Sequence, residues 1–338
     1  MKIIVDAFGG DNSPDEVIKG AAMAVEKLDV DIVLTGDEEK IKKFASENNV
    51  SLDRITIMHT ESVIDIHEEP TRIIKERSDC SMAIGLKALA DGEGDAFVSA
   101  GSTGALVVGA TFIAKRLKGI KRAALAPILP TDKGQVMLID AGANVDCRPE
   151  MLVQFAIMGS CYMEKVLGYE NPNVGLINVG AEDTKGREMD VEAYKMLQKA
   201  PVNFGGNLEA RELPFGEFQV AVSDGFTGNV ALKLYEGMGK FFSNSIKGIF
   251  KGSFGGKIAA LLVMKEIKAF RKKLDTSEVG GAVLMGIAKP VIKAHGNSDA
   301  KAFYNAIRQA KNCVDGDVIG EISRSLEQLK AKEAAGSK

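Results

Sequence analysis

Short glycine-containing turns follow four apolar runs of this chain, and turns of this kind are suited to binding anions. They read VSAGSTGA (98–105), IDAGAN (139–144), NVGAED (178–183) and SDGFTGN (223–229). In the first, Ser102, Thr103 and Gly104 stand where a strand passes into a helix, so free backbone N–H groups and the positive end of the helix dipole converge there. The pattern predicts an anion site, although glycine in a tight turn also has a purely conformational use.

The turn SDGFTGN repeats this arrangement at the start of a long helical stretch. Asp224 closes the strand, Thr227 and Gly228 open the helix, and Asn229 is placed to aim its amide at a bound anion or a developing oxyanion. Thr227 fits a simple helix cap equally well. Two such turns favour a phosphate site more than either turn alone. A nucleotide site is disfavoured, because GxGxxG is absent and GSFGGK lacks the P-loop spacing.

Two cations and one histidine stand near other predicted strand ends. Lys185 and Arg187 follow NVGAED, where a cation neutralises phosphate or the charge of an acyl-transfer intermediate. A solvated charged loop is the more common outcome for such a segment. His295, in IKAHGNSD, lies at a predicted cleft edge, and a catalytic or a hydrogen-bonded structural histidine fits there.

Templates for covalent or metal chemistry find little support. HExxH and GxSxG are absent, and the four cysteines stand far apart without a CxxC pair. The acidic pairs Asp6 with Asp11 and Asp140 with Asp146 lie near strand ends. Mg²⁺ binding is one reading of these pairs, but capping and loop ordering are the more common roles. We expect no metal site and no protein nucleophile.

Charge and hydropathy exclude several classes of protein. The chain has 338 residues and a formal net charge of −3, which does not favour nucleic acid binding. Residues 1–11 contain too few apolar residues for a signal-peptide core. The longest apolar run, about 258–264, is far below the ~20 residues of a membrane-spanning helix. With its dispersed cysteines, the chain is expected to be cytoplasmic.

Apolar runs alternate with helical stretches along most of the chain. We expect the first helix to begin with a capping box of Ser13 as N-cap, Pro14 at N1 and Glu16 as its partner. The β-α-β-α order predicts an α/β fold with one mainly parallel sheet, and the four turns at its carboxyl edge, where such folds bind ligands. The expected strands are residues 2–5, 31–35, 54–59, 95–99, 135–140, 173–178, 218–223 and 291–294.

A different pattern begins after the last of the four turns. Two long helical stretches, 227–250 and 256–273, joined by a glycine-rich turn predict a helical hairpin over about 227–275. We expect a single α/β domain over residues 1–330 that includes this hairpin, followed by a flexible tail at 331–338.

The hairpin combines positive charge with an apolar stripe. Residues 240–273 contain nine Lys or Arg and a single acid, Glu266. Phe254, Ile258 and Leu262 are spaced to lie on one side of a helix. This stripe fits core packing, contact with anionic lipid, or a docking surface for an acidic partner protein.

Eight ordered blocks of sequence carry a resemblance to a known family. They read IIVDAFGGDNSP, VSAGSTGAL, ALAPILPT, LIDAGANVDCRPE, QFAIMGS, GLINVGAEDTKG, VSDGFTGNVALKLYEG and KPVIKAHGNSDAKAFYNAIRQA. Through them, nearly the whole chain resembles the acyl carrier protein:phosphate acyltransferase family. Phe8, where methionine is expected, and the divergent loop 207–218 are the departures. The resemblance implies a Rossmann-like three-layer α/β/α fold of the isopropylmalate dehydrogenase type, a homodimer, and no metal or nucleotide cofactor.

The resemblance also implies an activity and the residues that perform it. A fatty acyl group would pass from acyl carrier protein to inorganic phosphate, giving acyl phosphate for phosphatidic acid synthesis. Lys185 and Asn229 would be catalytic, and the hairpin would contact an anionic membrane or the downstream glycerol-3-phosphate acyltransferase. The expected phosphate- or substrate-binding residues are Ser102, Thr103, Gly104, Asp224, Thr227, Gly228 and His295.

Rival functions remain open on the sequence alone. One is an enzyme of similar architecture that acts on coenzyme A thioesters, as phosphate acetyltransferases do, or an NAD- and metal-dependent dehydrogenase of β-hydroxy acids. The other is a non-catalytic membrane adaptor that uses only the basic hairpin.

Overall fold

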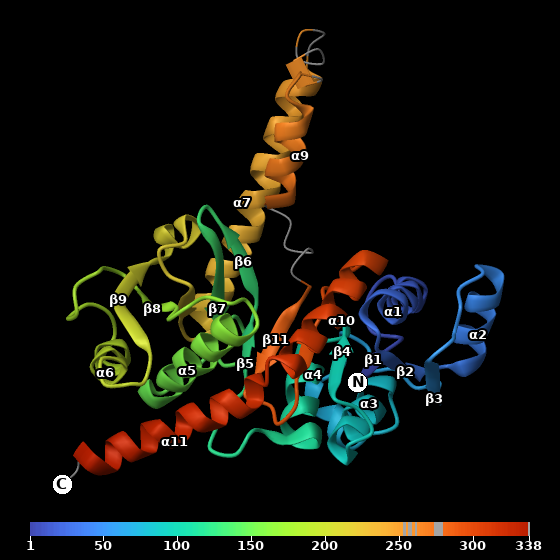
Figure 1. Ribbon diagram of the computed structural model, residues 1–338, viewed down its shortest axis with the longest axis horizontal. Coiled ribbons are helices and arrows are strands. Elements are labelled where there is room, and N and C mark those ends of the chain that lie inside the picture. Colours follow the sequence, from blue (N-terminus) through green and yellow to red (C-terminus); the bar gives the residue numbers. More distant parts are fainter. Residues whose placement is uncertain (253–254, 256–258, 261, 274–279, 337–338) are drawn as a thin grey trace.

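Two mainly parallel β-sheets covered by helices form the body of the molecule, and a helical hairpin projects from it (Figure 1). The structure is a computed structural model that describes residues 1–252, 255, 259–260, 262–273 and 280–336. The predicted α/β class is confirmed. The prediction of one sheet is wrong, because the chain passes from one sheet to the other at Pro127, between two short consecutive strands.

The first sheet has seven strands in the order β3-β2-β1-β4-β12-β11-β5. Strand β11 is antiparallel to both of its neighbours, and the other pairs are parallel. Strand β4 is buried along its whole length, as is typical of a strand covered on both faces. The strands are β1 (Lys2–Asp6), β2 (Asp31–Gly36), β3 (Ile55–His59), β4 (Ala96–Ser99), β5 (Ala124–Ala126), β11 (Ala282–Met285) and β12 (Val291–Lys293).

The second sheet has five strands in the order β6-β7-β10-β8-β9. Strands β6 and β7 form an antiparallel hairpin, and the remaining pairs are parallel. Strands β5, β6, β9 and β11 were not among the expected strands. The prolines in ALAPILPT and the glycine pair in NFGGNLE hide the pattern of the first three, and β11 is a stretch of only four residues. The strands are β6 (Ile128–Thr131), β7 (Gly134–Ile139), β8 (Asn173–Asn178), β9 (Asn203–Glu209) and β10 (Val220–Val222).

Helices cover both faces of the first sheet and join the two sheets through one continuous core. Helices α1, α5, α6, α10 and α11 contribute to the core cluster that spans both sheets, whereas α3 and α4 cover the opposite face of the first sheet. The helices are α1 (Asp15–Leu28), α2 (Glu38–Glu47), α3 (Ser81–Asp91), α4 (Thr103–Gly109), α5 (Pro149–Lys165), α6 (Glu188–Leu197), α10 (Ala300–Asp315) and α11 (Val318–Gly336), with short helices at Pro70–Ile74, Ala110–Lys115 and Ala210–Phe215.

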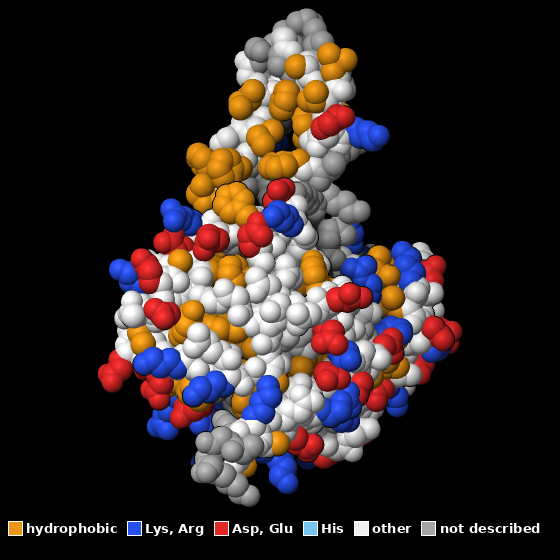
Figure 2. Space-filling view, turned by 60° about the vertical axis from the view of Figure 1, so that its left-hand side comes forward, with side chains coloured by type: hydrophobic (Ala, Val, Ile, Leu, Met, Phe, Trp, Pro, Cys, Tyr) orange, Lys and Arg blue, Asp and Glu red, His pale blue; other side chains and the backbone are white. Residues whose placement is uncertain are grey.

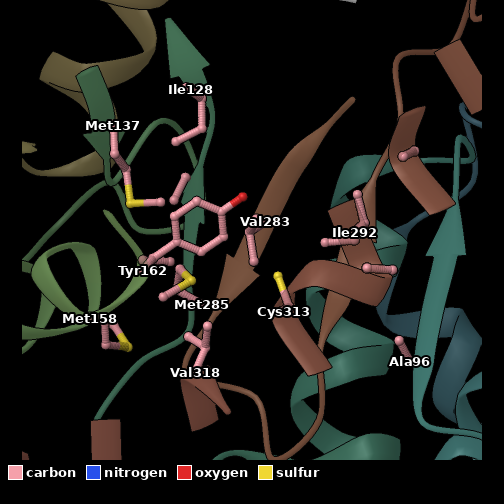
Figure 3. Packing of buried hydrophobic residues seen from close by; sticks show 14 of the residues in the cluster. Ala96, Ile128, Met137, Met158, Tyr162, Val283, Met285, Ile292, Cys313 and Val318 are labelled. Carbon is pink, nitrogen blue, oxygen red and sulfur yellow. The ribbon is translucent and has the colours of Figure 1, made fainter. Parts of the chain in front are cut away.

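Tyr162 of α5 lies in the centre of this core, between Met137 of the second sheet and Val283 of the first (Figure 3). Its hydroxyl accepts a 2.9 Å hydrogen bond from Nε2 of Gln309 on α10. Gln309 also accepts a 2.8 Å hydrogen bond from the N–H of Gly281, just before β11. The buried polar groups of Tyr162 and Gln309 are therefore hydrogen-bonded, as is usual for polar groups in a core.

The predicted capping box at the start of α1 is wrong. Pro14 occupies the N-cap position, and the Ser13 hydroxyl donates to the Gly10 carbonyl at 2.7 Å instead. The Glu16 carboxylate accepts the N–H of Ala300 at 2.8 Å, at the start of α10. A partner distant in sequence thus replaces the local one, because α1 and α10 pack side by side.

The predicted hairpin consists of α7 (Gly225–Lys251) and α9 (Met264–Lys273), which extend away from the body (Figure 1). Hydrophobic side chains gather along it, whereas charged side chains are scattered over the body (Figure 2). Phe254 and Ile258 lie outside the described residues, and Leu262 is 81% exposed, so core packing within this chain does not cover it. The other exposed apolar residues of these two helices and their connection include Leu234, Met238, Phe241, Phe242, Ile249, Val263, Met264 and Phe270.

The end of the chain is helical for most of the segment expected to form a flexible tail. Helix α11 continues to Gly336. No helix of the described residues is both long enough and apolar enough to cross a membrane.

Candidate active site

Three of the four glycine-containing turns meet at the carboxyl ends of neighbouring strands. The turns that begin at Asp140, Val179 and Ser223 follow β7, β8 and β10, which are adjacent in the second sheet. The turn with Ser102 follows β4 and belongs to the first sheet. The expectation that all four turns share the edge of one sheet is therefore wrong, because the strands divide between two sheets.

The carboxylate of Asp140 organises the turn after β7. This side chain is completely buried. Oδ1 accepts the N–H of Leu125 at 2.8 Å and those of Gly142 and Ala143 at 3.2 and 3.1 Å. Oδ2 accepts the N–H and the side-chain amide of Asn144 at 2.7 and 2.9 Å. Burial raises the pKa of Asp140, and these hydrogen bonds oppose that rise.

The first turn of α7 packs directly on the Asp140 turn. A Cβ at Gly228 would lie 1.9 Å from the carbonyl oxygen of Asp140, so only glycine fits there. The N–H of Gly225 donates to the carbonyl of Asn144 at 2.7 Å. This contact brings the exposed Asn229 beside Gly142, whose Cβ position lies 3.7 Å from the amide carbon of Asn229. The structure thus gives Gly228 a role in close packing, and its role in substrate binding stays a prediction.

Asp224 caps α7 and faces a cation. Its Oδ1 accepts the N–H of Thr227 at 2.7 Å, so Asp224, rather than Thr227, is the N-cap. Its Oδ2 accepts Nη2 of Arg187 at 2.5 Å. Burial opposes ionisation of Asp224, but the hydrogen bonds from Thr227 and Arg187 outweigh it and hold the pKa of this carboxyl below its ordinary value.

Arg187 connects the loop after β8 to the start of α7. Nε and Nη2 also donate to Oδ2 and Oδ1 of Asp190, both at 2.9 Å, and these hydrogen bonds are the main reason that the pKa of Arg187 is raised. The fork geometry of a guanidinium allows this double engagement. Arg187 is therefore a structural link, and its charge is already paired.

Lys185 lies two residues before Arg187 and is exposed. Its backbone is fixed, because its carbonyl accepts the Asn178 side-chain amide at 2.9 Å and its N–H donates to the Glu182 carbonyl at 3.2 Å. Among the residues that the structure describes, its ammonium has no carboxylate partner. A fixed backbone with an unpaired charge suits a side chain that meets an anion.

The first sheet contributes a second group of loops, anchored by a buried carboxylate. Asp6, at the end of β1, accepts the hydroxyls of Ser81 and Ser99, both at 2.7 Å. The Ser99 hydroxyl in turn accepts the N–H of Gly101 at 3.0 Å. Burial raises the pKa of Asp6, and the serine hydrogen bonds oppose the rise. Asp6 therefore orders the turn that leads to Ser102, as the loop-ordering alternative to metal binding predicts.

The predicted anion turn of the first sheet opens a short helix. The Ser102 hydroxyl caps α4 by accepting the N–H of Ala105 at 3.4 Å, and Thr103 is exposed. A Cβ at Gly104 would lie 2.7 Å from Pro70, so this glycine permits close packing. Helix α4 spans only Thr103–Gly109. The conformational reading of these glycines is thus supported by the packing, and the anion reading stays a prediction.

His295 lies in the turn after β12, the strand that pairs with β4. His295 is an exposed residue, yet the protein around its ring lowers the pKa, and the positive charges of Lys293, Lys233 and Lys240 add to this effect. Glu236 opposes it. Because Lys233, Glu236 and Lys240 belong to α7, the loops of the first sheet and the helix that starts beside Asn229 lie close to one another.

Lys293 is a half-buried cation that was not among the expected site residues. Its ammonium donates to the carbonyl of Ala100 at 3.2 Å and to that of Ala294. Burial lowers its pKa to about 8, although Asp11 and Asp6 oppose the shift. The only sequence signal is its place in an alternating strand beside Ser99, which does not distinguish a buried lysine from an exposed one.

The cysteines and acidic groups give no further chemistry in the described part of the chain. Burial raises the pKa of Cys147 to about 12 and that of Cys80 to about 11, so both thiols stay protonated at neutral pH. Within the same part of the chain, no cluster of three or more His, Cys, Asp or Glu is placed to hold a metal ion.

Nearly the whole chain matches a protein-family model and a phosphate acyltransferase of known sequence. A family model described as "Fatty acid synthesis protein" matches residues 1–321. The chain is 46% identical over 330 residues to the phosphate acyltransferase of Oceanobacillus iheyensis, which covers 97% of this chain and 98% of that protein.

Solved structures show the same fold at low sequence identity. A phosphotransacetylase from Streptococcus pyogenes matches with a TM-score of 0.64 at 18% identity, covering 93% of this chain and 94% of that one. A 4-hydroxythreonine-4-phosphate dehydrogenase from Klebsiella pneumoniae matches with a TM-score of 0.54 at 12% identity, covering 93% and 99%. These likenesses confirm the predicted fold class and carry no statement about substrate.

We predict that Arg187→Ala destabilises the protein and loosens the link between the Lys185 loop and α7. Loss of hydrogen bonds to two carboxylates should lower the free energy of unfolding by about 1–2 kcal/mol, with the exposure of the guanidinium limiting the effect. Arg187→Lys keeps a cation beside Asp224 and should lose less. Because the pKa of Asp224 is lowered in the native state, its stabilisation is present above the ordinary carboxyl pKa and is lost as the pH falls through the native value.

Urea unfolding of both Arg187 variants from pH 7 down to the acid range tests this. The stability gap between wild type and Arg187→Ala should be widest near neutral pH and should narrow as Asp224 becomes protonated. A gap that does not change with pH would show that the Arg187–Asp224 pair contributes nothing.

We also predict an alkaline signature of Lys293. Its native pKa of about 8 lies below its ordinary value of 10.5, so the unfolded chain binds more protons between these values and stability rises with pH there. From pH 8 to 10, the free energy of unfolding of wild type should rise by roughly 2 kcal/mol relative to Lys293→Met. Urea titrations over this range measure the difference, with the exposed Lys195→Met as control. Parallel profiles for wild type and Lys293→Met would contradict the assignment.

Proposed function

This chain belongs to the phosphate acyltransferase family of fatty acid synthesis, and we propose that it transfers a fatty acyl group from acyl carrier protein to inorganic phosphate at the edge of its second sheet. Family membership rests on the match over 97% of the chain and makes the protein an acyltransferase. The observation that supports this location is the Arg187 link, which joins the loop of Lys185 to the helix start of Asn229.

The reaction needs little from the protein beyond charge and alignment. A phosphate oxygen attacks the thioester carbonyl, a C–O bond forms, and the C–S bond then breaks to release the carrier's thiolate, which takes up a proton. Phosphate is already an anion near neutral pH, so no protein nucleophile is required. In this proposal Lys185 neutralises phosphate, and the Asn229 amide donates to the oxyanion of the tetrahedral intermediate.

The loops of the first sheet complete the substrate site in this proposal. The His295 turn lies close to α7, and the Ser102–Gly104 turn lies in the adjacent strand connection. We assign phosphate or thioester contacts to Ser102, Thr103 and His295. Asp224, Thr227 and Gly228 contribute by holding the first turn of α7 in place.

A coenzyme A thioester is the main rival substrate. The fold likeness to a phosphotransacetylase favours it only at the level of architecture. Parallel assays with acyl carrier protein thioesters and coenzyme A thioesters of the same acyl chain separate the two. The adaptor hypothesis is disfavoured, because it gives no role to the Lys185 and Asn229 turns.

We predict that Lys185→Ala and Asn229→Ala fold normally but transfer little acyl group to phosphate. Asn229→Ala should reduce kcat by ~10²-fold, the usual cost of removing one donor to a developing oxyanion, and Lys185→Ala should cost a comparable ~10²-fold because the charge of phosphate is no longer neutralised. The measurement is phosphate-dependent loss of the acyl carrier protein thioester, and Lys195→Ala, an exposed lysine of α6, is the control. Near wild-type turnover by both variants would refute the proposed site.

The hairpin is proposed to hold the enzyme at an anionic membrane surface. Its exposed apolar side chains and its excess of basic residues support this role. Contact between the hairpin and glycerol-3-phosphate acyltransferase is a further proposal that the resemblance implies. The homodimer, which the resemblance also implies, is a separate proposal.

We predict that Leu262→Glu and Phe254→Glu weaken co-sedimentation with vesicles of anionic phospholipid, because a carboxylate on the stripe opposes both insertion and charge attraction. Phe112→Glu is the matched control, since Phe112 is 64% exposed on the body of the molecule. Sedimentation that is unchanged in both hairpin variants would show that the stripe does not contact lipid.

A further inference from the structure

A cavity of about 610 Å³ opens between α5, α6, α11 and the segment before β5. This volume lies in the range of roughly 300–1,000 Å³ found for small-molecule sites. None of its lining residues belongs to the turns that form the candidate active site. The cavity is therefore a separate feature of the chain that the proposed reaction does not use.

The apolar part of the cavity lining is aliphatic. Val153 of α5 and Leu326 of α11 are almost fully buried, and the partly exposed Met196 of α6 and Leu329 of α11 extend the same surface outward. The lining contains no aromatic ring on which a nucleobase would stack. An alkyl chain is the ligand that such walls suit, because it gains free energy from burial alone.

The rim of the cavity is cationic. It carries four lysines, Lys121, Lys199, Lys330 and Lys332, against one acid, Glu150. The Glu150 carboxylate lies 3.5 Å from the ammonium of Lys121 and accepts no hydrogen bond through its buried Oε2. With Lys121 paired to Glu150, three lysines of the rim are left to face a ligand. Their positive charges favour an anionic head group.

The backbone and the side-chain amide at the rim leave room for a charged head group but offer it no free amide. Gly119 has a φ of +96°, and a Cβ there would lie 3.5 Å from the Lys330 ammonium. The amide of Gln154 is already occupied, since Oε1 accepts the N–H of Lys121 at 2.8 Å and Nε2 donates to the Gly119 carbonyl at 2.9 Å. No side-chain amide is thus left to read a base or a sugar.

We propose that this cavity binds a single-chain anionic amphiphile, a fatty carboxylate or an alkyl or acyl phosphate. The alkyl chain lies against Val153, Met196 and Leu326, and the head group lies among the lysines. The proposal does not depend on the proposed reaction or on the position of its active site.

Isothermal titration calorimetry of the full chain tests this with three probes of equal chain length. Laurate and monododecyl phosphate, below their micelle concentrations, should bind saturably with one molecule per chain. Dodecyltrimethylammonium should bind roughly ten-fold or more weakly, because the rim repels a cation. The tighter of the two anions identifies the head group. Absence of saturable binding by both anions, or equal binding of the cation, overturns the proposal.

Variants locate the binding. Lys199→Glu combined with Lys330→Glu should weaken both anions about ten-fold, while Lys195→Glu on helix α6, four residues before Lys199, should bind as wild type does. Met196→Trp, which fills the cavity, should abolish binding. Because Lys199 and Lys330 are exposed, the double variant is expected to fold even if Met196→Trp does not. Unchanged binding by the double variant overturns the proposal, as does loss of binding in Asn229→Ala, which would place the amphiphile in the active site.

Discussion

The buried carboxylate of Asp140 is the interaction on which the arrangement of this molecule depends. Its oxygens accept N–H groups from Leu125 of the first sheet and from the turn of the second sheet. Its own backbone carbonyl touches Gly228, which fixes where α7 begins. Burial disfavours the charge, and the converging donors compensate for that cost. Two sheets and the longest helix therefore share one anchoring point, and the candidate active site lies beside it.

A division of tasks follows from this anchoring. Buried charges, such as Asp140, Asp224 and Asp6, order the loops, whereas the exposed Lys185 and Asn229 are left free to meet a substrate. Arg187 stands between these two classes, because it is exposed and yet committed to Asp190 and Asp224. In our proposal, acyl transfer takes place at this edge of the second sheet, and the loops of the first sheet supply the other side of the site.

Local patterns were sufficient for the strands with continuous apolar runs, and residues 173–178 match β8 in full. They failed where the deciding contact is distant. The Glu16 carboxylate accepts the N–H of Ala300 and so does not form the predicted capping box. The division into two sheets depends on β5 pairing with β11 rather than with β6. The partial burial of Lys293 had no local signal either. The proposed catalytic roles of Lys185 and Asn229 came from the resemblance, since their residue types alone equally suit a solvated loop and a helix start.

The order of the strands has a consequence for how this chain is made. All five strands of the second sheet lie between Ile128 and Val222, so a nascent chain holds every one of them before the hairpin emerges. The first sheet cannot form completely at that stage, because β12 and β11, which are synthesised later, lie between β4 and β5. Until residues 282–293 leave the ribosome, β4 and β5 present unpaired edges that invite pairing with other chains. A nascent chain stalled within the hairpin thus has a complete set of strands for the second sheet but an incomplete first sheet. The segment after the hairpin, which contains β11 and β12, completes the first sheet.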